Sequence, residues 1–304
     1  MKKIAAIDIG SNAVRILICY VIQSGNQEIF QKNSYQRLPL RLGEDSFRDG
    51  IISDKKIKTL SEALISFKYM MRVHNVDEYQ IYATSALRES KNSLNVISEV
   101  EETSGLKINL INGLKEAKII ANGNPLSKLE FNKTYLYVDV GGGSTEYSIL
   151  RKGVDKKSKS FKIGTVRLLN NTINLSILGE IEKWLKSNTD QNDKVKLYAT
   201  GGNINKIQTM TGTKTGKPIS YLSVKDLLNN LQLHSYKERM IKYNLNPDRA
   251  DVIIPALKIF ILTMESVSSN KMFIPKVGLV DGMVKEIFYE KNGCKLDPYL
   301  KFFN

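Results

Sequence analysis

The stretch that most constrains the fold is Tyr135–Glu146, in which an apolar strand, an aspartate and three consecutive glycines follow one another. Glycine has no Cβ, so the backbone amides of Gly141–Gly143 can approach a ligand closely and form an anion-binding concavity. Asp139 at the strand end and Glu146 a few residues later supply carboxylate oxygens that suit a hydrated divalent cation. Such a turn can be purely structural, but an amide cradle beside metal ligands predicts a phosphate-binding loop between two strands.

The same arrangement occurs once more near the N-terminus, in residues Ile4–Asn12. An apolar strand leads to Asp8, and the glycine turn at Gly10 opens into a second apolar strand from Val14 to Tyr20. One repetition of the segment, far away in the sequence, differs from the short and numerous repeats of a solenoid. It predicts two related halves, each with a phosphate-binding loop, that face one ligand across a central cleft.

Composition limits the class of protein. The length of 304 residues predicts two domains, and a hydrophobic content of 42% is ordinary for a globular chain. No apolar run approaches the roughly 18 residues of a membrane helix, so we expect no membrane partner. Cys19, in an apolar strand, and the distant Cys294 indicate thiols and not a disulfide, which favours the cytoplasm. The two histidines, His74 and His234, cannot supply a multi-histidine zinc site.

Charge indicates the kind of partner. The chain carries 45 basic and 31 acidic residues, for a net charge of +14. This excess favours a polyanion, such as nucleic acid, polyphosphate, a nucleotide or an anionic membrane. Of these we expect a phosphate compound and not nucleic acid, and we treat a homodimer as possible.

The order of strands and helices predicts an α/β fold in two copies. Strands are expected over 3–8, 13–22, 27–37, 79–83, 107–111, 134–140, 145–151, 157–163, 194–199 and 271–274, the first three as an antiparallel meander. Helices are expected over 54–73, 92–104, 176–188, 223–233, 236–243, 248–268 and 281–291, with others near Glu116 and after residues 200–203. Ser53 is expected to cap the first helix, and Gly105 to end the second. A link at 122–125 separates a domain 1–123 from a domain 124–304, whose last helix can pack back on the first.

Seven motifs, in order, resemble those of the exopolyphosphatase and guanosine pentaphosphate phosphohydrolase family, in its short two-domain form. They are Ile7–Arg15, Ala83–Arg88 with Asn92, Gly113–Ala117, Val138–Glu146, Gly164–Leu168, Ala199–Gly202 and Arg249–Ile253. The resemblance covers nearly the whole chain and implies duplicated ribonuclease H-like domains, as in the actin-like, sugar-kinase-like and Hsp70-like superfamily. Two positions depart from the family: Lys115 stands where a glutamate is usual, and Val280 where an arginine is frequent.

The resemblance also implies roles in phosphoanhydride hydrolysis. Glu116 is the base that activates a water, Glu146 holds the water or a metal ion, and Asp139 and Asp8 bind Mg²⁺ or Mn²⁺ through water. The phosphate-binding residues are Gly10, Ser11, Asn12, Arg15, Arg88, Gly141, Gly142, Gly143, Ser144, Thr145, Arg167, Gly201 and Gly202, with the arginines as clamps on phosphate oxygens. Lys115 and Lys206 are weaker candidates that line an exit path for a polyanion. Without the resemblance, Glu116 is equally explained as a glutamate that stabilises a helix N-terminus. Asp139 and Asp8 have the alternative of satisfying turn amides, and each arginine by itself is more often a surface residue.

These residues predict a magnesium-dependent hydrolase that removes terminal phosphate from inorganic polyphosphate. Guanosine pentaphosphate is the alternative substrate of the same class. An actin-like ATPase or small-molecule kinase would need an adenosine pocket, for which Ala199–Asn203 is the candidate segment. A polyphosphate or alarmone sensor without turnover is a further alternative, and intact Glu116 and Glu146 argue against it.

Overall fold

The computed structural model describes residues 1–24, 27–123, 133–151, 155–189 and 195–292. The chain forms two compact units, one of Met1–Gly123 with Leu279–Pro298 and the other of Asn124–Gly278 with Tyr299–Asn304. The helix expected over 281–291 therefore lies in the first unit, in line with the expectation that it packs back on the first domain, although the predicted boundaries numbered it with the second. Residues 25–26, most of the predicted link at 122–125 and Cys294 fall outside the described residues.

The first unit is built on a mixed sheet in the order β3-β2-β1-β4-β5. Its strands are β1 (Lys2–Ile9), β2 (Val14–Ser24), β3 (Gln27–Leu38), β4 (Glu78–Ala83) and β5 (Asn109–Leu110). The pairs β1–β2 and β2–β3 are antiparallel, so the predicted meander is confirmed, and β4 joins β1 in parallel. Cys19 on β2 is 3% exposed, so the predicted core thiol is confirmed.

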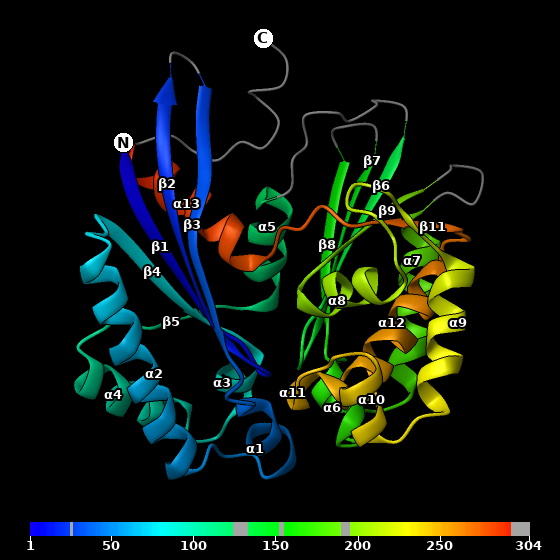
Figure 1. Ribbon diagram of the computed structural model, residues 1–304, viewed down its shortest axis with the longest axis horizontal. Coiled ribbons are helices and arrows are strands. Elements are labelled where there is room, and N and C mark those ends of the chain that lie inside the picture. Colours follow the sequence, from blue (N-terminus) through cyan, green and yellow to red (C-terminus); the bar gives the residue numbers. More distant parts are fainter. Residues whose placement is uncertain (25–26, 124–132, 152–154, 190–194, 293–304) are drawn as a thin grey trace. The chain divides into compact units, whose positions relative to one another are not determined.

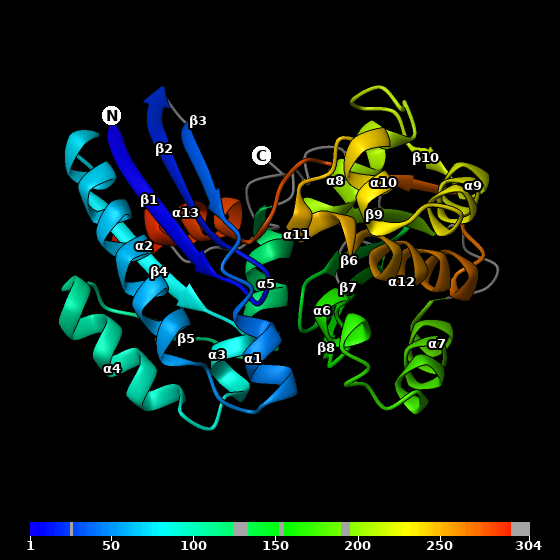
Figure 2. The same cartoon turned by 60° about the horizontal axis from the view of Figure 1, so that its bottom comes forward.

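Helices cover both faces of this sheet (Figure 1). One face packs against α1 (Leu42–Arg48), α2 (Asp54–Val73), α3 (Ser85–Glu89) and α4 (Ser93–Ser104) through a cluster that includes Ile7, Ile16 and Phe67. The other face packs against α5 (Gly113–Gly123) and α13 (Leu279–Lys291), which lie beside each other in Figures 1 and 2. A Cβ on Gly282 of α13 would lie 2.0 Å from the carbonyl oxygen of Ile119 on α5. Only glycine lets the two helices approach this closely.

The second unit repeats the plan. Its sheet has the order β8-β7-β6-β9-β11-β10, which matches the first sheet strand for strand with β10 added at one edge. The strands are β6 (Thr134–Val140), β7 (Thr145–Arg151), β8 (Asp155–Phe161), β9 (Lys196–Thr200), β10 (Ile219–Ser220) and β11 (Lys271–Phe273). Two mixed sheets of the same strand order confirm the predicted duplicated α/β fold.

The helices of the second unit share one core with one face of its sheet, through residues such as Leu136, Tyr147 and Phe260. They are α6 (Thr165–Leu169), α7 (Ser176–Asn188), α8 (Gly202–Met210), α9 (Tyr221–Gln232), α10 (Tyr236–Lys242), α11 (Pro247–Ala250) and α12 (Ile253–Ser266). The single helix expected over 248–268 is wrong, because it is divided into α11 and α12. A proline has no backbone N–H, so Pro255 would interrupt the hydrogen bonds of one continuous helix. A proline is tolerated in the first turn of a helix, and Pro255 lies in the first turn of α12.

Local signals located most other elements correctly. Gly105 ends α4 with a φ of 68°, as predicted. Helix α2 begins at Asp54 as predicted, but the hydroxyl of Ser53 does not cap it and instead donates to Asp45 Oδ2 at 2.5 Å. The short elements α1, α3, α6 and β10 were not predicted. Among the described residues, no helix has both the length and the apolar character needed to cross a membrane.

Candidate functional site: two glycine turns and their carboxylates

The turn between β1 and β2 is closed by a hydrogen bond from the amide of Gly10 to the carbonyl of Ala13 at 3.1 Å. A Cβ on Gly10 would lie 3.0 Å from that same carbonyl oxygen. The turn between β6 and β7 is closed in the same way, from the amide of Gly141 to the carbonyl of Ser144 at 3.0 Å. A Cβ on Gly141 would also lie 3.0 Å from its partner oxygen. The two predicted phosphate loops therefore share one backbone geometry.

The carbonyl groups of the three glycines in the second turn are bound by α6. The amides of Thr165 and Val166 donate to the carbonyls of Gly141 and Gly142 at 3.0 and 2.9 Å. The carbonyl of Gly143 accepts a buried hydrogen bond from Nε of Arg167 at 2.6 Å. In a planar trans peptide, the N–H points opposite to the C=O. The amides that follow these carbonyls therefore point away from α6.

These three amides belong to Gly142, Gly143 and Ser144. Among the described residues, none of them donates a backbone hydrogen bond. A run of amides that point to one side is the arrangement that binds anions such as phosphate. The predicted phosphate contacts of Gly142, Gly143 and Ser144 thus fit through the backbone.

The first turn is supported similarly by the segment that leads into α1. The amide of Gly43 donates to the carbonyl of Ser11 at 2.8 Å, and the amide of Arg41 donates to the carbonyl of Asn12 at 3.1 Å. The same peptide geometry directs the amides of Asn12 and Ala13 away from that segment. The hydroxyl of Ser11 is paired with that of Ser85 on α3 at 2.8 Å. Ser11 is therefore connected to α3 by its side chain.

Two glycines outside the turns allow these supports to form. A Cβ on Gly164 would lie 2.4 Å from the carbonyl carbon and oxygen of Gly142, and a Cβ on Gly43 would lie 2.9 Å from Cβ of Ser11. Gly164 begins the motif Gly164–Leu168 but had no predicted role, and Gly43 was not among the predicted site residues. A glycine just before or at the start of a short helix was the only local signal for either residue.

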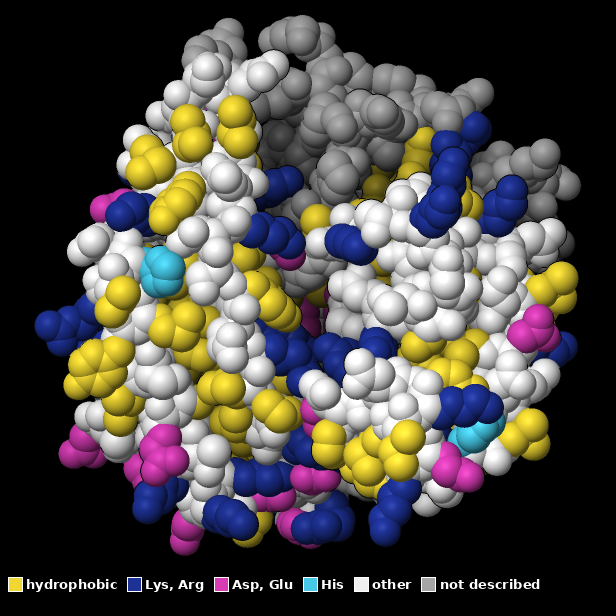
Figure 3. Space-filling model, in the orientation of Figure 1, with side chains coloured by type: hydrophobic (Ala, Val, Ile, Leu, Met, Phe, Trp, Pro, Cys, Tyr) yellow, Lys and Arg dark blue, Asp and Glu magenta, His cyan; other side chains and the backbone are white. Residues whose placement is uncertain are grey.

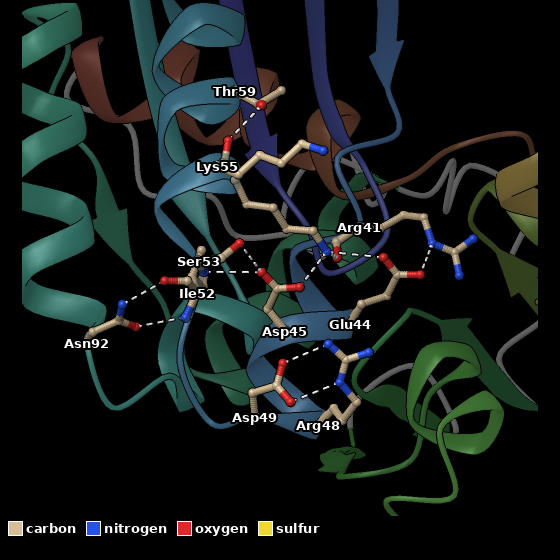
Figure 4. A network of polar contacts seen from close by, with 11 residues as sticks. Arg41, Glu44, Asp45, Arg48, Asp49, Ile52, Ser53, Lys55, Thr59 and Asn92 are labelled. Atoms are coloured by element: carbon tan, nitrogen blue, oxygen red, sulfur yellow. Dashed lines mark hydrogen bonds and ion pairs between the residues drawn. The ribbon is translucent and has the colours of Figure 1, made fainter.

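A network of charged residues fixes α1 to the start of α2 (Figure 4). Lys56 Nζ donates to the carbonyl of Arg41 at 2.5 Å and pairs with Glu44 and Asp45 at 3.1 and 2.9 Å. Burial by itself would raise the pKa of Asp45, but hydrogen bonds from Ser53 and Lys56 outweigh it and lower the pKa. The network thereby holds the segment that supports the first turn.

Asp139 and Glu146 form a carboxylate pair in the second unit. They are directly opposite each other on the antiparallel strands β6 and β7, so their side chains share one face of the sheet. The hydroxyl of Thr200 donates to Asp139 at 2.7 Å, and that of Ser160 donates to Glu146 at 2.8 Å. Mg²⁺ in proteins is commonly held by one or two carboxylates together with waters and substrate phosphates. The pair fits that requirement, although the described residues contain no group of three or more metal-binding side chains.

The matching positions in the first unit hold Asp8 and Arg15. They are opposite each other on β1 and β2, and Arg15 Nη1 lies 2.5 Å from Asp8 Oδ2. Burial raises the pKa of Asp8, while the charge and hydrogen bond of Arg15 act in the opposite direction. Since its carboxylate is already neutralised by a guanidinium, Asp8 suits a metal ion less well than Asp139 does.

Arg88 and Glu116 meet in the first unit. Arg88 Nη1 donates to the carbonyl of Ile111 at 2.8 Å and lies 3.8 Å from Glu116 Oε2. Glu116 is in the first turn of α5, as predicted, and is 9% exposed. Arg88 is three residues beyond Ser85, and residues at that spacing share one side of a helix. Because Ser85 pairs with Ser11, α3 links the first glycine turn to Arg88.

Other predicted residues have structural partners. The hydroxyl of Thr145 is buried and donates to the carbonyl of Ile163 at 2.7 Å. Gly201 has a φ of 98°, and a Cβ there would lie 3.0 Å from Asp139 Oδ1. The carbonyl of Gly202 accepts from Arg249 Nη1 at 2.7 Å. Lys206 donates to the carbonyl of Asn244 at 2.9 Å. These contacts show Thr145, Gly201 and Gly202 shaping the surroundings of the second turn.

Comparison with known proteins places the chain in a family. The model of the Ppx/GppA phosphatase family matches residues 20–290. A bifunctional 3-dehydroquinate synthase/phosphatase from Fusobacterium nucleatum is 32% identical over 277 residues, which are 82% of this chain and 41% of that protein. A guanosine-5'-triphosphate,3'-diphosphate pyrophosphatase from Pseudoalteromonas translucida is 26% identical over 93% of this chain and 57% of that protein. The chain thus spans about half the length of these curated relatives.

A solved structure has the same fold. The crystal structure of an exopolyphosphatase from Cytophaga hutchinsonii aligns with a TM-score of 0.78 and 19% sequence identity, over 97% of this chain and 99% of that one. At this identity the likeness concerns the fold alone.

Proposed function

The chain belongs to the Ppx/GppA phosphatase family, and from this membership we propose that it hydrolyses the terminal phosphoanhydride bond of inorganic polyphosphate. The observation that carries the proposal is the repeated glycine turn. In each copy, carbonyl groups are bound to a supporting segment, and the amides that follow them point the other way. Amides arranged in this way bind phosphate oxygens without any change in the loop.

Glu116 is the base in this proposal. It accepts a proton from a water whose oxygen attacks the terminal phosphorus. The bond from that phosphorus to the bridging oxygen breaks, which releases orthophosphate and a polyphosphate shortened by one unit. The Arg88 guanidinium, 3.8 Å from the Glu116 carboxylate, adds positive charge beside the reacting phosphate. Asp139 and Glu146 would hold Mg²⁺ or Mn²⁺, and a bound ion supplies further positive charge to the phosphate oxygens.

Two observations bear on the substrate. The net charge of +14 favours a long polyanion. Lysine and arginine side chains are spread over the displayed face of each unit, with acidic side chains between them (Figure 3). The relative from Pseudoalteromonas translucida, named for a guanosine substrate, favours guanosine pentaphosphate as the second candidate. A cytoplasmic location and a homodimer stay predictions of the sequence.

The test is phosphate release by the purified protein with polyphosphate, guanosine pentaphosphate or ATP, each with Mg²⁺. We expect polyphosphate to give the highest kcat/KM. Glu116→Gln should lower kcat by about two to four orders of magnitude, the usual contribution of a general base, while polyphosphate binding persists. Near-normal turnover of a well-folded Glu116→Gln sample would remove Glu116 from the role of base. Binding without turnover by the unaltered protein would instead indicate a sensor.

A further inference from the structure

We propose that Lys115, Tyr82 and Glu286 form a latch that positions the first turn of α5, and with it Glu116. The latch joins three elements of the first unit: Lys115 is on α5, Tyr82 on β4 and Glu286 on α13. The inference rests on the proposed role of Glu116 as base. It assigns Lys115 a positioning role and no contact with substrate.

The contacts centre on the hydroxyl of Tyr82. Lys115 Nζ donates to this oxygen at 3.0 Å and lies 4.6 Å from the centroid of the tyrosine ring. The hydroxyl in turn donates to Glu286 Oε2 at 2.7 Å. Tyr82 is 3% exposed, so its hydroxyl needs protein partners to replace water. The buried hydroxyl of Tyr82 thus donates to Glu286 on α13 and accepts from Lys115 on α5.

The charges of the latch support each other. Burial raises the pKa of Tyr82, and the hydrogen bond and charge of Glu286 raise it further, so the hydroxyl remains a donor. Burial also raises the pKa of Glu286, while Tyr82 and the positive charge of Lys115 oppose that change. Lys115 therefore favours the ionised form of Glu286, and Tyr82 connects the two side chains.

Packing alone does not set the direction of the lysine. A cavity of about 350 Å³ opens beside it, lined by Gln80, Tyr82, Asn109, Leu110, Ile111, Asn112, Lys115 and Glu290. A lysine chain next to such a space has several accessible rotamers, and ordering it has an entropic cost. The observed rotamer of Lys115 is selected by its interactions with the hydroxyl of Tyr82, with the face of the Tyr82 ring and with the carboxylate of Glu286.

The consequence concerns the neighbouring residue. Lys115 and Glu116 are consecutive in the first turn of α5, where Asn112 Oδ1 also accepts from the amide of Lys115 at 2.8 Å. Consecutive residues project to different sides of a helix, so Lys115 fixes the rotation of the turn from one side while Glu116 meets Arg88 on another. An error of about 1 Å in a catalytic group can cost roughly a hundredfold in rate. A loosened latch should therefore lower kcat and leave KM nearly unchanged.

The test compares Lys115→Met and Glu286→Gln with Lys118→Met, an exposed position on the same helix. We expect each latch variant to lower kcat about tenfold, with KM for polyphosphate unchanged within twofold and Lys118→Met like the unaltered protein. Lys115→Glu with Glu286→Lys should recover most of the lost kcat, because the hydroxyl of Tyr82 can exchange its donor and acceptor partners. An unchanged kcat in Lys115→Met would overturn the latch. A fall in kcat/KM that comes mainly from a higher KM would overturn it as well.

A second measurement does not depend on activity. Amide hydrogen exchange over residues 113–120 should become faster in Lys115→Met and in Glu286→Gln, and slow again in the charge-exchanged double variant. Unchanged exchange in both single variants would also overturn the latch. Failure of the proposed function has a different signature, namely an unaltered protein without phosphate release or a Glu116→Gln variant that keeps its turnover.

Discussion

At the scale of single residues, the two units differ at one matching pair of positions. The second unit has two carboxylates there, Asp139 and Glu146, and the first has an ion pair, Asp8 with Arg15. Two carboxylates on one face offer the oxygen ligands that a divalent cation prefers. The carboxylate of Asp8 is instead paired with a guanidinium. This contrast favours the second unit as the one that would bind the metal ion.

The first prediction is therefore about the metal. Asp139→Asn should raise the Mg²⁺ or Mn²⁺ concentration that gives half-maximal phosphate release, because it removes one of the two proposed charged ligands. Asp8→Asn should change the metal requirement much less. The measurement is the rate of phosphate release against metal concentration after treatment with a chelator. Full activity of the unaltered protein after exhaustive chelation would contradict the assignment.

At the scale of elements, short helices and their connections support the glycine turns. Helix α6 binds the carbonyls of the second turn, and the segment before α1 binds those of the first. Neither α1 nor α6 has more than seven residues, and a helix this short is not stable by itself in water. Both helices therefore depend on the contacts they make with the turns and with the rest of their unit.

The second prediction tests the close approach at Gly164. Its Cβ would lie 2.4 Å from the carbonyl of Gly142, so Gly164→Ala should displace the second turn and lower kcat/KM for polyphosphate at least tenfold. Overpacking of this kind costs about 1–3 kcal/mol of unfolding free energy. The matched control is Gly179→Ala on α7, where nothing lies within 4 Å of the added Cβ. That control should keep full activity and gain up to about 1 kcal/mol in stability.

The third prediction concerns acid stability and Asp45. Its pKa is lowered in the folded chain by Ser53 and Lys56, against the opposing effect of burial. A lowered pKa adds stability that is fully present above the unfolded value of 3.8 and is lost as pH falls through the folded value. Asp45→Asn should therefore lower the thermal midpoint at pH 7 but have little effect at pH 2. A midpoint difference that is the same at both pH values would show that the ionised carboxylate is not the source.

At the scale of the whole molecule, the net charge of +14 is the property most relevant to a polymeric substrate. Attraction between separated surface charges is screened over about 8–10 Å at physiological salt. We expect a long polyphosphate to meet many of the basic side chains distributed over the surface in Figure 3. We expect a short substrate to be held mainly by the glycine turns and Arg88. The two substrates should therefore differ in their response to salt.

The fourth prediction follows from this difference. Affinity for long polyphosphate should weaken steeply between low and physiological salt, while affinity for a short chain should weaken less. The measurement is equilibrium binding of both lengths at two salt concentrations. Equal salt slopes would mean that the basic residues serve solubility and do not attract the substrate, which would favour guanosine pentaphosphate.

The sequence by itself determined the features that depend on neighbours along the chain. The antiparallel meander, the two glycine turns, the start of α2 and the end of α4 at Gly105 all follow from local patterns. The duplicated order of strands followed from the echo of Asp8–Gly10 in Asp139–Gly141. Alternating apolar residues and glycines limit the backbone directly, so these features could be predicted before any tertiary contact was known.

Tertiary structure decided what each side chain does. The phosphate contact of Arg167 stays a prediction, and the structure adds a hydrogen bond from its Nε to the carbonyl of Gly143. Ser53 was predicted to cap a helix, yet its hydroxyl donates to Asp45. Lys115 was known only as a departure from the family, and the structure connects it through Tyr82 to Glu286 on the last helix. In these cases the partner lies on another element, and a hydrogen bond is decided by distance in space, which spacing along the chain does not determine.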